Sequence, residues 1–316
     1  MMRTRVLFSL LPCLFLTGCD LEELASSERY QSDFHYSYAL APGGRLEVEG
    51  FNGSIEITGW DENRCDITGV KTASTIDMRD RIKVDVSQGQ NAIYVRSVRP
   101  AMSDWHSNVG VRFVIRVPRK VELSRIVTSN GSIHVEGTAG PADLKTSNSS
   151  IRAVSVDGRV AARTSNGSIT MDGVSGVLDL HTSNSAIRAE HVMSSISATT
   201  SNGSITAHFD EKALPSESPL KFETSNSSVD VTMNRSPRSD IRASTCNGSI
   251  TLRLPADSSA KVSASTSNGS VHSDFQVDNA DMEKHKRHQS LEETLGSGGP
   301  LIDLHTSNSS IRLLKI

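Results

Sequence analysis

The stretch TSNGSIT (164–170) and its near copy TSNSAIR (182–188) belong to a set of seven-residue words that recur through most of the chain. Each word is centred on Asn and reaches Ile or Val three residues later, and the central residues are Asn52, Asn130, Asn148, Asn166, Asn184, Asn202, Asn226, Asn247, Asn268 and Asn308. From Asn130 to Asn202 every gap is 18 residues. A fixed period of roughly 20 residues predicts a solenoid, in which each repeat covers its neighbour.

Hydrophobic alternation gives the shape of one repeat, which we call a rung. In the word at Asn166, the residues Val160, Ala162 and Thr164 alternate with polar residues. A period of two places them, together with Asn166, on one face of a strand. The next apolar position, Ile169, breaks this parity, so we expect a corner just after the Asn. A glycine about ten residues after the Asn predicts a second corner.

Two all-β folds fit this pattern. Asn-Gly favours a tight hairpin and hence an antiparallel meander. In four words, however, Asn is followed by Ser-Ser or Ser-Ala, and these residues do not readily adopt the positive φ of that turn. The sequence therefore predicts a parallel β-solenoid (β-helix or β-roll) with rungs of about 18 residues.

The repeated Asn predicts an internal ladder of amides. A buried Asn without partners costs about 1–3 kcal/mol, but stacked amides can donate to one neighbour and accept from the other. We expect this arrangement at Asn130, Asn148, Asn166, Asn184, Asn202, Asn226, Asn247, Asn268 and Asn308. Words with Asn-Ser tend to continue into Arg and words with Asn-Gly into Thr, and between Asn148 and Asn202 the two kinds alternate. Like charges on adjacent rungs are thereby kept apart.

The N-terminus predicts export and lipidation. Arg3 and Arg5 precede an apolar run that is too short for a stable membrane span, which is typical of a signal peptide. The run ends in Leu-Thr-Gly-Cys, which resembles the lipobox of bacterial lipoproteins. We therefore expect a signal peptide over 1–18, lipid on Cys19 and a polar tether over 19–32. The acylated Cys19 makes a lipid bilayer the first expected partner.

The rest of the chain divides into a part where the repeated words are rare and a part where they recur regularly. Residues 33–125 carry one early word and long irregular links, which predicts irregular N-terminal rungs and a cap. Residues 126–316 are expected to form the regular solenoid, interrupted by a charged loop at 277–300 and completed by a final rung. Cys65 and Cys246 remain after the signal, and the sequence leaves open whether they pair.

The words GSIEITGW (53–60), FVIRVPRKVEL (113–123), the serial TSNGSI words and GSGGPLIDLHTSNSSI (296–311) resemble a family of bacterial envelope proteins labelled "putative adhesins". The resemblance covers nearly the whole chain from about residue 30. It implies a right-handed β-solenoid and no established activity. Ser in place of Gly at several corners departs from the family pattern.

Few residues suggest chemistry. The formal net charge of −3 gives no basic footprint for nucleic acid. Outward acids form no convergent cluster with a general acid and base, and His285 and His288 lack a third ligand nearby, so we expect no catalytic residue, metal or cofactor. Lys145, Arg163 and His181 share one outward position on three rungs, which makes them a candidate binding stripe or simply a solvated face.

These observations predict a non-catalytic, lipid-anchored protein of the bacterial envelope or cell surface that serves as a scaffold or adhesin-like binding surface. Its envelope or extracellular ligand is unknown. Two alternatives stay open at this point. One is a carbohydrate-active enzyme, a polysaccharide lyase or hydrolase on a β-helix. The other is an accessory protein of the envelope-stress response.

Overall fold

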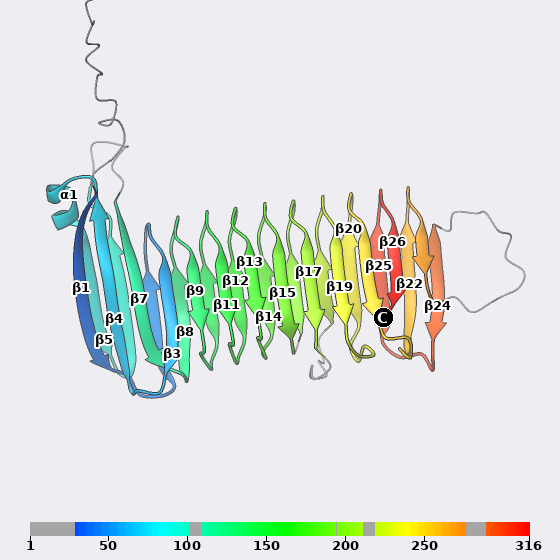
Figure 1. Cartoon of the computed structure of the whole chain (residues 1–316), viewed down its shortest axis with the longest axis horizontal. Coiled ribbons are helices and arrows are strands. Elements are labelled where there is room, and N and C mark those ends of the chain that lie inside the picture. Colours follow the sequence, from blue (N-terminus) through cyan, green and yellow to red (C-terminus); the bar gives the residue numbers. More distant parts are fainter. Residues whose placement is uncertain (1–28, 102–108, 194, 211–218, 276–288) are drawn as a thin grey trace, which may run out of the picture.

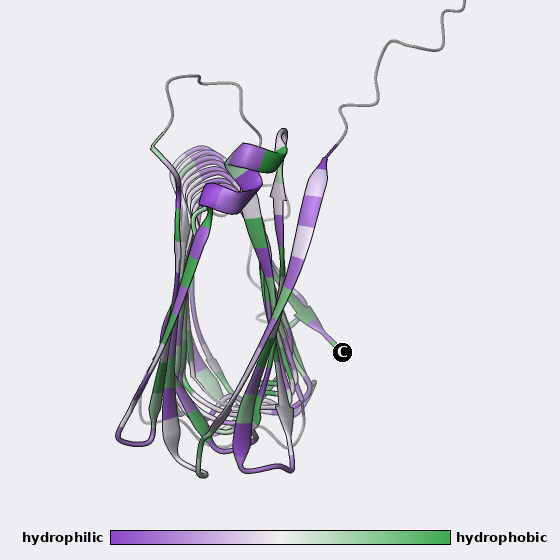
Figure 2. Ribbon diagram, turned by 90° about the vertical axis from the view of Figure 1, so that its left-hand side faces the viewer, coloured by the Kyte–Doolittle hydropathy of each residue, from purple (hydrophilic) through white to green (hydrophobic). Residues whose placement is uncertain are grey.

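The computed structural model describes residues 29–101, 109–193, 195–210, 219–275 and 289–316. Within these residues the chain forms 26 strands and one short helix. The strands make two 13-stranded sheets that run side by side along an elongated stack (Figures 1 and 2). The predicted β-solenoid is therefore confirmed.

The regular part of the stack repeats one strand in each sheet per rung. One sheet contains β9 (Ile133–Glu136), β11 (Ile151–Val154), β13 (Ile169–Asp172), β15 (Ile187–Val192), β17 (Ile205–Phe209), β19 (Val229–Met233) and β21 (Ile250–Leu254). The other contains β8 (Val121–Val127), β10 (Ala142–Lys145), β12 (Val160–Arg163), β14 (Leu178–His181), β16 (Ile196–Thr199), β18 (Leu220–Glu223) and β20 (Ile241–Thr245). Neighbours are parallel and in register, so that Ile151 pairs with Ile169 and Val160 with Leu178.

The core lies between the two sheets and follows the predicted alternation. Each short strand buries its first and third residues, as in β12, where Val160 and Ala162 are fully buried between exposed or half-buried neighbours. Ala162 pairs with Leu144 on one side and Leu180 on the other. Stacking small on large residues in this way lets short rungs fill the narrow interior without cavities.

The N-terminal cap combines antiparallel pairs at its outer end with parallel pairs where it joins the stack. Its elements are β1 (Tyr30–Ala39), β2 (Gly44–Glu49), β3 (Ile55–Trp60), β4 (Arg64–Ala73), α1 (Ile76–Arg81), β5 (Lys83–Gly89), β6 (Ala92–Val98) and β7 (Gly110–Pro118). The order β1–β4–β7 ends one sheet and the hairpin β5–β6 ends the other. The rung formed by β2 and β3 does not come first in space, because β6 and β7 lie outside it.

The C-terminal end has a rung order that differs from the sequence order. Its strands are β22 (Ala260–Thr266), β23 (Val271–Ser273), β24 (Ser290–Leu295), β25 (Leu301–Thr306) and β26 (Ile311–Lys315). β25 lies between β20 and β22, and β26 lies between β21 and β23. The predicted final rung is thus inserted one place before the end, where it has a neighbour on both sides.

The segment 277–300, predicted as a charged loop, needs correction in its second half. Ser290–Leu295 form β24, which pairs antiparallel with β22, while 276–288 lie outside the described residues. The reason is the alternation in SLEETL, which places Leu291, Glu293 and Leu295 opposite the inward residues of β22. Glu293 accepts a hydrogen bond from Ser273 at 3.3 Å. A charge pointing inward on an edge strand discourages further pairing.

The corner between the sheets explains why Gly and Ser alternate after the Asn. A Cβ atom at Gly167 would lie 1.7 Å from the carbonyl oxygen of Ser149 on the preceding rung, and Gly203 meets Ser185 at the same distance. Only Gly fits above such a carbonyl. In the stack, Asn-Gly and Asn-Ser rungs alternate without a break from Asn130 onward, because the inserted Asn-Ser rung separates the last two Asn-Gly rungs.

Candidate functional site: the asparagine corner and the hollows of the cap

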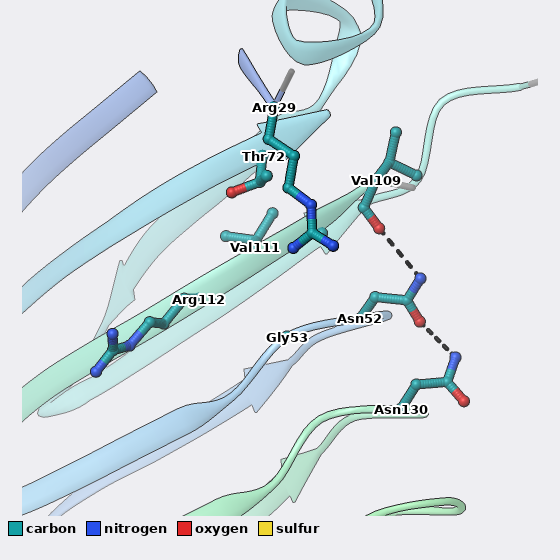
Figure 3. A pocket seen from close by; sticks show the side chains of 9 residues that line it. Arg29, Asn52, Gly53, Thr72, Val109, Val111, Arg112 and Asn130 are labelled. Carbon is teal, nitrogen blue, oxygen red and sulfur yellow. Dashed lines mark hydrogen bonds between the residues drawn. The ribbon is translucent and has the colours of Figure 1, made fainter. Parts of the chain in front are cut away.

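The predicted asparagine ladder exists. Nine hydrogen bonds of 2.5–2.8 Å join the side-chain amides of ten Asn residues, each Nδ2 donating to the Oδ1 of the next rung toward the cap. Their order in space is Asn52, Asn130, Asn148, Asn166, Asn184, Asn202, Asn226, Asn247, Asn308 and Asn268. At the cap the ladder ends on the carbonyl oxygen of Val109, to which Asn52 donates at 3.1 Å (Figure 3). Nine steps of about 4.8 Å make the ladder about 43 Å long.

The ladder is external, which corrects the prediction that it lines the interior. Asn52 is half-buried and the other nine Asn are exposed. The physical reason is the end of the strand. In the rung of Asn166, β12 ends at Arg163, so the alternation that places Val160 and Ala162 inward no longer applies to the bend that follows.

In nine of the ten words, the Thr two residues before the Asn occupies the interior position instead, and the word at Asn52 has Gly50 there. Thr164 is 5% exposed and Thr182 is 0% exposed. The Thr164 hydroxyl donates to the carbonyl oxygen of Ser149 at 3.0 Å and accepts from the Gly167 amide at 3.3 Å. Thr182 likewise donates to the carbonyl oxygen of Gly167 at 2.9 Å. The buried corner is therefore satisfied by Thr and backbone, while the Asn amides stabilise the outer surface.

The candidate stripe of Lys145, Arg163 and His181 is assembled as predicted, since these exposed residues pair in register on β10, β12 and β14. Its central cation, Arg163, already lies beside two carboxylates. Arg163 Nη2 lies 2.6 Å from the carboxylate of Asp179, and Nη1 lies 3.9 Å from that of Asp143. The stripe therefore resembles a solvated face with internal ion pairs.

A cluster of acids and histidines on the other sheet was not predicted as a site. His191 Nδ1 lies 2.9 Å from Asp172, and His208 Nδ1 lies 2.8 Å from Glu190. The hydrogen bond to Asp172, with the charge of Asp210, raises the pKa of His191 above its ordinary value. His191 has a φ of +52°, at a corner where two other rungs have Gly with a similar φ. The available sequence signal was a His at a position that Gly137 and Gly173 occupy in other rungs, because a non-glycine residue with positive φ is strained.

Two hollows indent the outer face of the cap, and sequence reasoning missed both. One of about 420 Å³ is lined by Arg29, Asn52, Gly53, Thr72, Val109, Gly110, Val111, Arg112 and Asn130 (Figure 3). A second, of about 610 Å³, is lined by Asp33, Phe34, His35, Thr68, Gly69, Val70, Arg112 and Val114. Arg112 belongs to both and donates to Glu56 at 2.9 Å. β4, which lies between β1 and β7, contributes Thr68, Gly69 and Val70 to the lining of the larger hollow.

The cysteines carry no site in the described part of the chain. Cys65 is buried and Cys246 is exposed, and both are free thiols. Burial, with the charge of Asp66, raises the pKa of Cys65 to about 12, so its thiol is unreactive at neutral pH. Cys19 lies outside the described residues, as do His285 and His288.

The described residues contain neither a metal site nor a membrane-spanning helix. Neither the cap nor the rungs hold three or more His, Cys, Asp or Glu side chains arranged to bind a metal ion. Among the same residues, no helix has the length and apolar character needed to cross a bilayer.

Comparison with known proteins gives two distant likenesses in structure. No family model and no curated protein matches the sequence. A Bacteroides fragilis protein described as a "putative adhesin" is 12% identical, with 89% of this chain and 97% of that one covered and a TM-score of 0.46. A Clostridium sporogenes "putative cell adhesion protein" is 9% identical, with 90% and 100% covered and a TM-score of 0.24.

Proposed function

We propose that this chain is a non-catalytic protein of the bacterial envelope, held on a membrane through lipidated Cys19, and that it presents an adhesin-like binding surface to an unidentified ligand. The observation that carries the proposal is the stack itself. Successive rungs place outward side chains in straight columns along two sheets, and the ladder ties one corner of neighbouring rungs together over about 43 Å. Such a surface suits display to a large partner.

The charged side chains on these sheets support display rather than turnover. Arg163 pairs with Asp179, His208 with Glu190, and Arg253 with Asp230. In each case a carboxylate that could act as acid or base is paired with a basic side chain on an adjacent rung of the same sheet. General acid–base catalysis needs groups that converge on one substrate position.

The anchoring half of the proposal is tested by paired cysteine variants. Cys19→Ala should abolish incorporation of labelled palmitate, and a wash at 0.5 M salt should then remove the protein from the membrane fraction. Cys13→Ala is the matched control, because it lies in the same leader and should change neither readout. Palmitate incorporation that survives Cys19→Ala would contradict lipidation at this residue.

The display half is tested with the purified chain immobilised on beads. We expect retention of envelope polysaccharides or whole cells without any change in polymer length, measured by size-exclusion chromatography. New chain ends that appear with the wild type and vanish with a single carboxylate variant, such as Glu190→Gln, would contradict the non-catalytic reading. Failure to retain any envelope component would contradict an adhesin-like surface.

A further inference from the structure

One end of the N-terminal cap gathers the start of β1, the end of β4, α1, the start of β5 and the end of β6. The strand registers place them together, since Tyr30 pairs with Ala73 and Lys83 with Val98. Figure 1 shows α1 beside the ends of β1 and β4, and Figure 2 shows it across the same end of the two sheets. We call this surface the tether rim and define it as residues 29–31, 71–83 and 98–101.

The tether rim is basic in an acidic protein. It carries six basic residues and two acids, a net charge of +4; these are Arg29, Lys71, Arg79, Arg81, Lys83 and Arg99, with Asp77 and Asp80. Without Arg3 and Arg5, the chain from residue 19 carries 31 − 36 = −5. The rest of that chain therefore carries 25 − 34 = −9. This asymmetry predicts attraction of the rim to an anionic surface.

Most of the basic side chains of the rim can contact an anionic surface. Arg79 and Arg81 pair with Asp80 and Asp77. The other four, Arg29, Lys71, Lys83 and Arg99, form no ion pair with any residue in the described ranges. The smaller hollow adjoins them and is lined by Arg29 and Arg112, whose guanidinium groups extend in different directions (Figure 3).

Exposed aliphatic side chains accompany these charges. Ile76 of α1 is 52% exposed and Val98 at the end of β6 is 37% exposed. Among the described residues, the other large hydrophobic side chains exposed to this degree are Tyr94, Val177, Leu301 and Ile316. Basic and aliphatic side chains together are the combination that binds the headgroup region of a bilayer.

The tether determines which surface the rim meets, and it is shorter than the predicted 19–32 because β1 begins at Tyr30. Nine residues lie between Cys19 and Arg29, which makes ten Cα-to-Cα steps. Fully extended, they span at most about 35 Å, so a lipid on Cys19 would hold the rim close to the bilayer. We propose that the tether rim docks on the phosphate headgroups of an anionic bilayer and so fixes the orientation of the stack. The position of the rim beside the bilayer rests on the proposed anchoring through Cys19, but the affinity of the rim for anionic headgroups does not.

The test uses the chain from residue 19 with Cys19→Ser and Cys246→Ser, which carries no lipid. We expect it to sediment with phosphatidylcholine vesicles containing 30% phosphatidylglycerol in 0.1 M salt and not with pure phosphatidylcholine. Binding should fall at 0.5 M salt, since screening weakens exposed charges. Replacing Arg29, Lys83 and Arg99 with Gln should weaken binding on the order of a hundredfold.

A control variant removes three exposed cations elsewhere, at Arg152, Lys261 and Arg312, and so changes the net charge equally. It should bind as the parent does. Equal loss in both variants, equal binding to neutral vesicles, or no binding to the anionic ones would overturn the proposal. A fluorophore on Ile76→Cys should shift to the blue only with anionic vesicles. Loss of palmitate incorporation in Cys19→Ala bears on the anchor alone, so the two proposals fail separately.

Discussion

Two substitutions in one word, Thr164→Val and Asn166→Ala, distinguish the interior of the corner from its surface. Val has the shape of Thr without its hydroxyl. Thr164→Val therefore leaves the carbonyl oxygen of Ser149 and the amide of Gly167 without their partners at 3.0 and 3.3 Å. Because Thr164 is 5% exposed, water does not replace the hydroxyl. Stranding buried polar groups in this way costs about 1–3 kcal/mol.

Asn166→Ala removes two ladder bonds, to Asn148 at 2.8 Å and from Asn184 at 2.7 Å. All three amides are exposed, so water takes the vacated positions. We expect a cost below about 1 kcal/mol, at the low end of the net value of a hydrogen bond.

The free energy of unfolding is measured by urea denaturation followed by far-UV circular dichroism, with hydrogen exchange of the β12 and β13 amides as a local readout. Thr164→Val should be the more destabilising change by both methods. A larger loss for Asn166→Ala would place the amide inside and refute the reasoning.

Three further outcomes follow from the corner and from the histidine cluster. Gly167→Ala forces a Cβ atom to within 1.7 Å of the Ser149 carbonyl oxygen and should cost about 1–3 kcal/mol or more in thermal or urea unfolding; a neutral result would contradict the close approach. Deleting the two rungs Gly167–Asn202 preserves the Gly/Ser alternation, so the product should melt at a higher temperature than a variant that lacks a single 18-residue rung. The reverse order of melting temperatures would contradict a requirement for the alternation. His191 has a folded-state pKa raised above 6.5 by Asp172, so its stabilisation is full below that pH and is lost as the pH rises through the folded value; His191→Gln should shrink the difference in melting temperature between pH 6 and pH 8, and an unchanged difference would remove His191 as its cause.

The repeated words determined the architecture because a period in the sequence becomes a period in space. The inward Ile, Val, Leu and Ala residues and the parallel stacking all followed from it. The position of the Asn did not, since the inward alternation of Val160, Ala162 and Thr164 ends just after β12 and the bend that follows turns the amide outward.

The order of the last rungs was missed although the sequence carries a signal for it. Asn247 and Asn268 are both followed by Gly, which breaks the alternation in sequence order, and inserting Asn308 between them restores it. The hollows and the tether rim had no such signal. They form where antiparallel strands of the cap bring together residues from non-repeated segments, and no period in the sequence specifies those pairings.

The order of rungs can be tested most directly with the native thiol of Cys246. In the stack, the backbone N–H of Asn308 donates to the carbonyl oxygen of Cys246, and the backbone N–H of Asn268 donates to the carbonyl oxygen of Ser307. A cysteine at position 307 is therefore about 4.8 Å from Cys246, within the range for a disulfide, while one at position 267 is twice as far away. Under mild oxidation Ser307→Cys should form an intramolecular disulfide and Ser267→Cys should not. A disulfide to position 267 and none to position 307 would contradict the inserted rung and the stacking of like positions on which this account depends.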